Sequence, residues 1–259
     1  MANPKILYQD LSTVTFSSSV GTNASYPVTN LKNYIATSYW SGSATTAGQR
    51  LIIDLGADTA VTTVIIDGHN FTGCGADQSV KIQYATDANF TTGVTNWSGD
   101  IAQTDDTTVT ATAATATKRY WAIIYNSSVP LTVPPRIGNI FIGTPLEFTT
   151  PYDYGYRTEN AEYVTTQKTS LNGITRTSQM YKGRIVYELT FNTQDNTLRT
   201  GYQTFVRTVR GKMFPFYFID DDGTTRYMHM TSDYSPVVTT QYGQNNIETL
   251  AMKTQQSTF

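Results

Sequence analysis

Cysteine is almost absent from this chain of 259 residues, which contains Cys74 alone. An intrachain disulfide is therefore impossible, and a chain of this length buries a sizeable core without covalent staples. Histidine is nearly as scarce, since only His69 and His229 are present. One Cys and two distant His do not give the ligand spacing of a zinc site. We therefore expect no metal and no other cofactor.

Charge is also sparse: charged residues make up 15% of the chain, and the formal net charge is -2. This balance supplies no long-range attraction to nucleic acid phosphates or anionic lipid. The start of the chain, Met1 to Lys5, lacks the apolar core of a signal peptide, and no apolar run approaches the length of a membrane span. We expect folding in a reducing cytosol, with no nucleic-acid partner and no membrane span.

Tyrosine and threonine are abundant instead. Aromatic residues make up 12% of the chain, and 18 of them are Tyr. Both residue types favour half-buried pleated surfaces, which indicates a mostly β protein. Tyr also favours wet interfaces, because its ring is apolar and its tip is polar. Sheet propensity and a surface used for contacts are two interpretations of this bias, and both stay open.

The centre of the predicted fold is a pair of short apolar runs, Leu51 to Leu55 and Val61 to Ile66. Each is about the length of a strand and too short for a typical helix. We expect Ala57 to Ala60 to form the connecting turn. Because Val64 to Ile66 is apolar without alternation, both faces of that strand are expected to be covered.

Further strands are predicted on both sides of this pair. Ile6 to Tyr8 is a possible first strand, and Val80 to Ala85 alternates with the period of a strand buried on one face. Arg119 to Tyr125 and Ile137 to Gly143 are two more. Thr104 to Thr117 has little bulk and predicts an exposed strand or a long loop.

These segments carry a family resemblance. In order they contain Tyr-Trp-Ser-Gly at 39–42, Leu-Ile-Ile-Asp-Leu-Gly at 51–56, Arg-Tyr-Trp-Ala-Ile-Ile-Tyr at 119–125 and Ile-Gly-Asn-Ile-Phe-Ile-Gly at 137–143. The set resembles the discoidin-type domain (F5/8 type C, galactose-binding-like). The resemblance implies a jelly-roll sandwich over Tyr8 to about Gly143. Extracellular members usually tie their ends with a disulfide, which this chain cannot form.

The second half predicts strands, one helix and a hairpin. Asn172-Gly173 is a strong turn signal between two short strands. The one convincing helix covers about Gln194–Arg210, with Thr193 or Asp195 as its cap and Gly211 as its stop. The apolar stripe of this helix is formed by Leu198, Tyr202, Phe205 and Val209.

Two features follow that helix. Asp220 to Gly223 predicts a hairpin turn in preference to a calcium loop, because the later bidentate Glu of such a loop is missing. Ile247 to Met252 predicts a last strand, with a polar tail from Thr254 onward.

A second resemblance comes from Phe-Pro-Phe-Tyr-Phe at 214–218 directly after Arg210-Gly211. This order is similar to the small β-sandwich domains of phage distal-tail and minor-tail proteins. We therefore expect two domains: residues 1–145 form a discoidin-like jelly roll, and residues 156–259 form a tail-type β-sandwich with one α-helix. Residues 146–155 are expected to link them.

Candidate binding residues are few, and no catalytic residue is predicted. Sugar binding uses exposed aromatic rings beside polar loops. Trp97 is the best exposed candidate, with a loop anchor packed on the sandwich as the alternative. His69, Asn70 and Phe90 are weaker candidates, and hydrogen bonding within a loop is the alternative for His69. The remaining aromatic candidates are Tyr26, Tyr39 and Phe71, whereas Trp40 and Trp121 are expected in the core.

The predicted function is structural. We expect a phage tail or baseplate component, located in the virion after synthesis in the host cytoplasm, which assembles with itself as a ring and with other tail proteins. The alternative is a carbohydrate-binding module that mediates adsorption to a host surface glycan. An enzyme acting on polysaccharide is the minor hypothesis.

Overall fold

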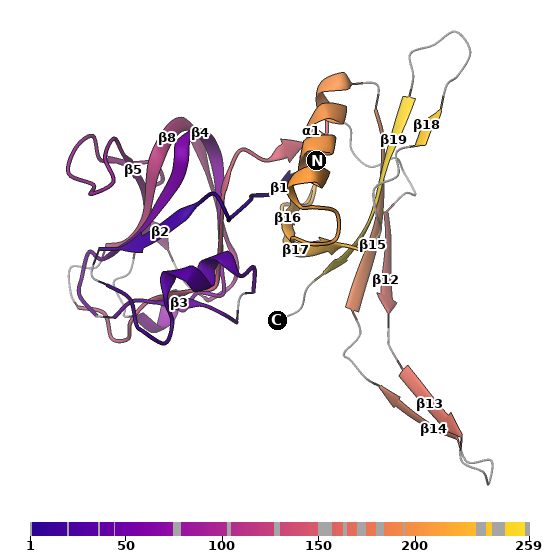
Figure 1. Cartoon of the computed structure of the whole chain (residues 1–259), viewed down its shortest axis with the longest axis horizontal. Helices are drawn as coiled ribbons and strands as arrows, with labels where there is room; N and C mark the ends of the chain where they lie inside the picture. Colours follow the sequence, from indigo (N-terminus) through magenta and orange to yellow (C-terminus); the bar gives the residue numbers. More distant parts are fainter. Residues whose placement is uncertain are drawn as a thin grey trace. The chain divides into compact units, whose positions relative to one another are not determined.

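The structure is a computed structural model of the chain. It describes residues 2–19, 21–35, 37–43, 45–74, 79–102, 105–126, 130–149, 157–162, 165–169, 175–179, 184–193, 195–231, 237–239 and 247–256. Within these residues the fold is mostly β with a single α-helix, as predicted (Figure 1). Among these residues no helix is long and apolar enough to cross a membrane.

The chain divides into two compact units. The first unit is Leu7–Pro145, and the second combines Met1–Ile6 with Leu146–Thr258. The start of the chain departs from expectation, because β1 (Lys5–Leu7) does not join the jelly roll. It lies in the second unit's sheet between β11 (Leu146–Glu147) and β16 (Phe216–Ile219). A three-residue apolar run predicts a strand but does not specify its partner.

The first unit contains nine strands and two short 3-10 helices within its described residues. These are β2 (Thr15–Ser18), η1 (Val28–Lys32), β3 (Trp40–Ser41), β4 (Arg50–Asp67), η2 (Phe71–Cys74), β5 (Ser79–Ala85), β6 (Thr95–Asn96), β7 (Ile101–Ala102), β8 (Val109–Asn126), β9 (Arg136–Ile137) and β10 (Asn139–Gly143).

Two long antiparallel strands, β4 and β8, form the frame of this unit (Figure 1). The prediction of two strands joined by a turn at Ala57 to Ala60 is wrong, since β4 is continuous through these residues. Its pairing with β8 shifts register between Asp54 and Thr59, and Gly56 has φ +78° there. The extra residues bend the strand without ending it. We call this end of the unit the bend end.

The bend lets β4 and β8 serve both layers of the jelly roll. Their halves next to Arg50 and Ile124 pair with β2 on one side and β5 on the other, whereas their other halves continue to the edge strand β10. Val64, Ile65 and Ile66 are fully buried, which confirms that both faces of this segment are covered. The core also contains the predicted Trp40 and Trp121.

Loops gather at the opposite end of the unit from the bend, and we call this the loop end. The segment around η1 and β3 lies beside the segment around β9, because Trp40 pairs with Ile137 and Ser41 with Arg136. A third loop follows β4 and includes η2. The Gly73 N–H donates to Asn70 O within it.

The second unit is built on one eight-stranded sheet. Its order is β11-β1-β16-β17-β19-β15-β12, with β18 also paired to β19. The remaining bounds are β12 (Arg157–Glu162), β15 (Arg184–Thr193), β17 (Thr225–Met230), β18 (Val237–Thr239) and β19 (Ile247–Gln256). The last strand is longer than predicted, since the expected polar tail at Thr254 still pairs with Tyr187. Backbone pairing tolerates polar residues that periodicity assigns to a tail.

A separate ribbon pairs β13 (Thr165–Thr169) with β14 (Thr175–Gln179). The predicted Asn172-Gly173 turn lies outside the described residues. The turn at Asp220 to Gly223 is confirmed, because the Gly223 N–H donates to Asp220 O and Gly223 has φ +84°.

The predicted helix is confirmed as α1 (Asn196–Thr208). The Asp195 side chain caps it by accepting the Thr197 N–H at 2.7 Å, and Gly211 follows its end at φ +63°. The predicted apolar stripe of Leu198, Tyr202, Phe205 and Val209 is buried.

Candidate functional site

His69 lies at the loop end but is fully engaged and 1% exposed. Its Nε2 is 2.7 Å from Thr107 O, and its Nδ1 accepts the Phe71 N–H at 3.4 Å. These contacts assign the ring proton to Nε2, which donates to Thr107. Burial lowers the pKa of His69, because desolvation disfavours the charged ring. The alternative of a hydrogen-bonded loop residue therefore describes His69.

Asn70 ties two loops together. Its Nδ2 donates to Pro134 O at 3.1 Å, and its Oδ1 accepts the Arg136 N–H at 2.8 Å. The buried thiol of Cys74 also lies 3.3 Å from Asn70 O. Both polar side-chain atoms of Asn70 thus hold the loop around β9 in place.

The Phe90 ring is buried against the sheet. It is 6% exposed and forms a cluster with Ala85 and Ala122, although its own backbone has φ +56°. Asp87 supports this left-handed conformation by accepting hydrogen bonds from the Thr91 and Thr92 N–H groups. The Thr92 hydroxyl, which also donates to Asp87, and these N–H groups hold the pKa of Asp87 well below its usual range.

The prediction that Trp97 is exposed is wrong. Its ring is 9% exposed, its Nε1 donates to Ala114 O at 2.8 Å, and it meets Trp121 edge to face at 5.5 Å. The indole has an apolar body and one donor, and both are satisfied inside the unit. Trp97 is thus the loop anchor that was the alternative interpretation. All four predicted binding residues thus make contacts that hold loops in place.

The structure brings a different set together at the loop end: Tyr26, Tyr39 and Arg136. The Tyr26 and Tyr39 rings stack at 4.4 Å between centroids and 16° between planes. The Arg136 guanidinium lies 5.3 Å from the centroid of Tyr39, within cation–π range. Tyr26 is 37% exposed, and Arg136 is also exposed. We call these three residues the loop-end cluster.

The backbone around each member of this cluster is fixed. The Ser41 N–H donates to Tyr26 O, and Asn30 Nδ2 donates to Tyr39 O at 2.9 Å. Arg136 is held by its pairing with Ser41 in the short β3–β9 ladder. The cluster is therefore preorganised, which lowers the cost of binding.

The electrostatics leave a cation beside a neutral aromatic surface. The Tyr26 side chain, through a hydrogen bond, and partial burial raise the pKa of Tyr39, while Arg136 opposes the shift. Tyr39 is therefore a neutral phenol at ordinary pH. Among the described residues no carboxylate forms an ion pair with Arg136. Its guanidinium is exposed and hydrogen-bonds to the Tyr39 side chain.

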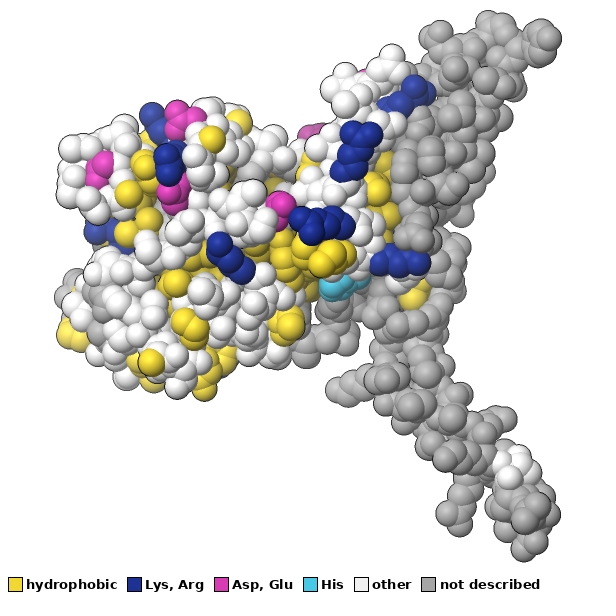
Figure 2. All heavy atoms as spheres, in the orientation of Figure 1, with side chains coloured by type: hydrophobic (Ala, Val, Ile, Leu, Met, Phe, Trp, Pro, Cys, Tyr) yellow, Lys and Arg dark blue, Asp and Glu magenta, His cyan; other side chains and the backbone are white. Residues whose placement is uncertain are grey.

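The surroundings of the cluster are weakly charged. Two more exposed apolar side chains, Ile35 (51%) and Val133 (40%), come from the same loops. On the face seen in Figure 2, the described Lys and Arg side chains lie singly or beside acidic ones, with no continuous basic surface. Such a surface suits packing of the apolar face of a neutral ligand on the rings better than binding of a polyanion.

The acidic triplet Asp220, Asp221 and Asp222 is the group of possible metal ligands found among the described residues. Asp220 is paired with Arg226, whose NH1 lies 2.6 Å from Asp220 Oδ2. The Thr224 N–H donates to Asp222 at 2.7 Å. The triplet thus forms the hairpin turn predicted from the sequence.

Comparison with protein families bears on the first unit. Residues 13–127 match the F5/8 type C domain. The match confirms the discoidin-like resemblance for that part of the chain, and the loop-end residues Tyr26 and Tyr39 fall inside it. No curated protein matches this chain.

Similar solved structures include three carbohydrate-binding modules. Chitosan-binding module 1 from the chitosanase/glucanase of Paenibacillus sp. IK-5 has 16% identity and a TM-score of 0.44, with 53% of this chain and 100% of the module covered. The family 32 module of Clostridium perfringens NanJ, solved with galactose, has 14% identity and a TM-score of 0.43, covering 54% and 98%. CBM32-1 from a family 31 glycoside hydrolase of C. perfringens has 14% identity and 0.44, covering 53% and 99%. At these TM-scores the likenesses carry no argument about this chain's ligand.

Arg136 is the member of the cluster that sequence reasoning missed. Tyr26 and Tyr39 belong to the aromatic candidates, but Arg136 follows two prolines in a connection with no periodic signal. It reaches the tyrosines through the β3–β9 pairing, which joins segments far apart in the chain. No local feature predicts that pairing.

Proposed function

We propose that this protein is a non-enzymatic carbohydrate-binding protein whose first unit holds a glycan at the loop-end cluster. The observation that carries the proposal is the exposed Tyr26–Tyr39 stack with Arg136 beside it. A pyranose presents an apolar face that packs on an aromatic ring, and its hydroxyl oxygens accept hydrogen bonds from a guanidinium. The match of residues 13–127 to the F5/8 type C domain supports this choice.

In this proposal each residue of the cluster has its own role. One face of Tyr26 lies against Tyr39, so its outer face supplies the stacking surface. Arg136 donates to sugar hydroxyls next to that surface. The ligand class is a surface glycan with an accessible sugar residue, and adsorption to a host surface is the setting in which such binding acts.

The phage-tail role expected from the sequence remains a hypothesis. It would place the protein in a virion, in contact with copies of itself and with other tail proteins. Carbohydrate binding and a place in a virion are compatible, because an adsorption protein requires both. We do not propose the tail role as the function, since no contact among the described residues carries it.

The test is glycan-array binding by the full chain, followed by calorimetry with the best glycan. Tyr26→Ala is expected to weaken binding about tenfold or more, because a ring contact contributes roughly 0.5–1.5 kcal/mol beyond its area and 1.4 kcal/mol is tenfold. Tyr26→Phe keeps the ring and is expected to retain most of the affinity.

Arg136→Lys keeps the charge but removes the planar donor fork, so it is expected to weaken binding as well. Val94→Ala, on an exposed apolar side chain of the same unit outside the cluster, is the matched control and is expected to leave glycan binding unchanged. Unchanged affinity in Tyr26→Ala and Arg136→Lys together would refute the proposal.

A further inference from the structure

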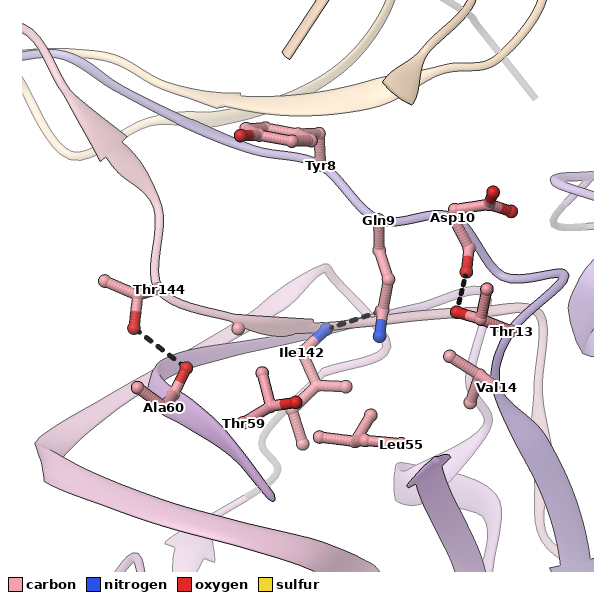
Figure 3. A pocket seen from close by; sticks show the side chains of 11 residues that line it. Tyr8, Gln9, Asp10, Thr13, Val14, Leu55, Thr59, Ala60, Ile142 and Thr144 are labelled. Atoms are coloured by element: carbon pink, nitrogen blue, oxygen red, sulfur yellow. Dashed lines mark hydrogen bonds between the residues drawn. The ribbon is translucent and has the colours of Figure 1, made fainter. Parts of the chain in front are cut away.

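A pocket lies at the bend end of the first unit, and none of the loop-end cluster residues lines it. It has a volume of about 400 Å³, within the range of roughly 300–1,000 Å³ of small-molecule sites (Figure 3). Three segments line it: the stretch from Tyr8 to Val14, the bend of β4 from Leu55 to Ala60, and the end of β10 with Thr144.

The position of this pocket follows from the register of β10. The start of β10 at Asn139 pairs with Asp67, near the loop end, whereas its last residue, Gly143, pairs with Thr63. Thr144 then donates its Oγ1 hydrogen to Ala60 O at 2.9 Å. The pocket thus sits beside the bend in β4, and its residues are separate from Tyr26, Tyr39 and Arg136.

Gln9 is a lining residue whose side-chain amide is fixed by a hydrogen bond within the protein. Its Oε1 accepts the Ile142 N–H at 3.0 Å, which satisfies a donor on the open edge of β10. Its backbone oxygen accepts the Tyr34 hydroxyl at 3.2 Å. With Oε1 used in this way, the Nε2 of the same amide is directed to the pocket side (Figure 3). The chain therefore presents an oriented amide donor there.

The other lining groups define the chemistry. Hydroxyl groups come from Thr13, Thr59 and Thr144, and the Tyr8 ring borders the pocket on the side opposite Leu55 (Figure 3). The Asp10 carboxylate accepts hydrogen bonds from Ser12 and points away from the pocket, and neither Lys nor Arg is among the lining residues (Figure 3). A pocket without a cation offers an anion nothing to offset its loss of hydration.

We infer that this pocket binds a small neutral molecule rich in hydroxyl groups, of monosaccharide or linear polyol type. One hydroxyl of the ligand accepts the hydrogen bond of Gln9 Nε2, and its carbon skeleton packs between the Tyr8 ring on one side and Val14 and Leu55 on the other. This site is independent of the proposed function, because its residues and the loop-end cluster do not overlap.

The experiment is an NMR titration of the full chain with galactose, with glucitol and with galacturonate, following the backbone amides of Gln9, Thr13 and Gly143. Galactose is a cyclic probe and glucitol a linear probe of the same ligand class, a neutral molecule rich in hydroxyl groups. We expect saturable shifts at these amides with one or both neutral probes. Galacturonate, which has the same size but a negative charge, is expected to bind at least about tenfold more weakly.

Two variants locate the site. Gln9→Glu keeps an oxygen that accepts the Ile142 N–H but removes the amide donor, so affinity is expected to fall about tenfold or more. Thr59→Tyr fills the pocket from an exposed position and is expected to abolish the shifts. Equal melting temperatures serve as the folding control, and Tyr26→Ala is expected to leave the titration unchanged.

Three results would overturn the inference. They are no saturable shift at the pocket amides with either neutral probe, full-strength binding in both Gln9→Glu and Thr59→Tyr, and equal affinity for galactose and galacturonate. Shifts confined to Tyr26 and Arg136 would also overturn it, while supporting the loop-end proposal. The two proposals can therefore be refuted independently of each other.

Discussion

Arg119 forms a bidentate ion pair with the carboxylate of Asp54 at the bend end of the first unit. Its Nε lies 2.7 Å from Oδ1, and its NH2 lies 2.9 Å from Oδ2. Asp54 Oδ1 also accepts the Gly56 N–H at 2.8 Å, where the backbone turns to φ +78°. The Asp of the Ile-Asp-Leu-Gly run thus fixes the point at which β4 bends.

Removing this pair is expected to have a small but measurable effect. Both side chains are partly exposed, at 43% and 24% for Arg119 and Asp54, and pairs of this kind contribute roughly 0.2–1 kcal/mol. We expect Arg119→Ala to lower the free energy of unfolding slightly in urea titrations. A double-mutant cycle with Asp54→Asn isolates the coupling, and a coupling of zero would contradict the assignment.

The same pair predicts an acid dependence. Hydrogen bonding to Arg119 lowers the pKa of Asp54 below its ordinary value of 3.8. The folded state therefore binds fewer protons than the unfolded state in this range, so the contribution is present above that value and is lost as pH falls through the folded pKa. Urea unfolding between about pH 4 and pH 2 should show a shallower loss in Arg119→Ala than in the natural chain.

Acidification near neutrality acts through the two histidines. Burial lowers the pKa of both His69 and His229 from 6.5. Unfolding then takes up protons just below that value, so we expect stability to fall as the pH drops from about 7 to 5.

The two residues can be separated by substitution. His69→Gln and His229→Gln should each flatten part of this slope in urea titrations, and the double variant should flatten most of it. A double variant with the natural slope would show that other groups titrate there.

Phe90 offers a direct check on a residue that the sequence nominates for binding. Its ring packs on Ala85 and Ala122, so Phe90→Ala is expected to lower the free energy of unfolding by roughly 3 kcal/mol. Val94→Ala, in an exposed position of the same loop, is the matched control and should stay within about 0.5 kcal/mol. Measured at a temperature where both variants are folded, glycan affinity is expected to be the same for both. A loss of glycan affinity in Phe90→Ala alone would show that Phe90 belongs to the binding site.

Cys74 should be inert in the folded protein. The residue is fully buried, and burial raises the pKa of its thiol to about 12, so the reactive thiolate is scarce. We expect no modification by iodoacetamide at mildly alkaline pH until denaturant is added. Mass spectrometry measures the reaction, and labelling at the rate of an exposed thiol would disprove this prediction.

Local patterns in the sequence predicted much of the fold. The spacing of Leu198, Tyr202 and Phe205 indicates a helix, and the residues before and after it are of the types that cap one. Val64 to Ile66 indicates a strand covered on both faces, as found. These features are recoverable because the side that a residue buries is set by the period of its own element.

Local patterns failed where the chain bends or ends. A bulge in β4 resembles a turn in sequence, since both use Gly, Asp and Thr in a short polar run. The strand β19 continues through residues that lack any apolar alternation.

Taken alone, the amino-acid order determined that this protein is mostly β, that residues near 196–208 form a capped helix and that no intrachain disulfide can form. Tertiary structure decided which side chains are available for binding. It buried Trp97 against Trp121 and placed Arg136 beside Tyr39. The physical reason is that exposure of a loop residue depends on packing between strands distant in the chain, and the register of those strands is set by the whole core rather than by neighbouring residues.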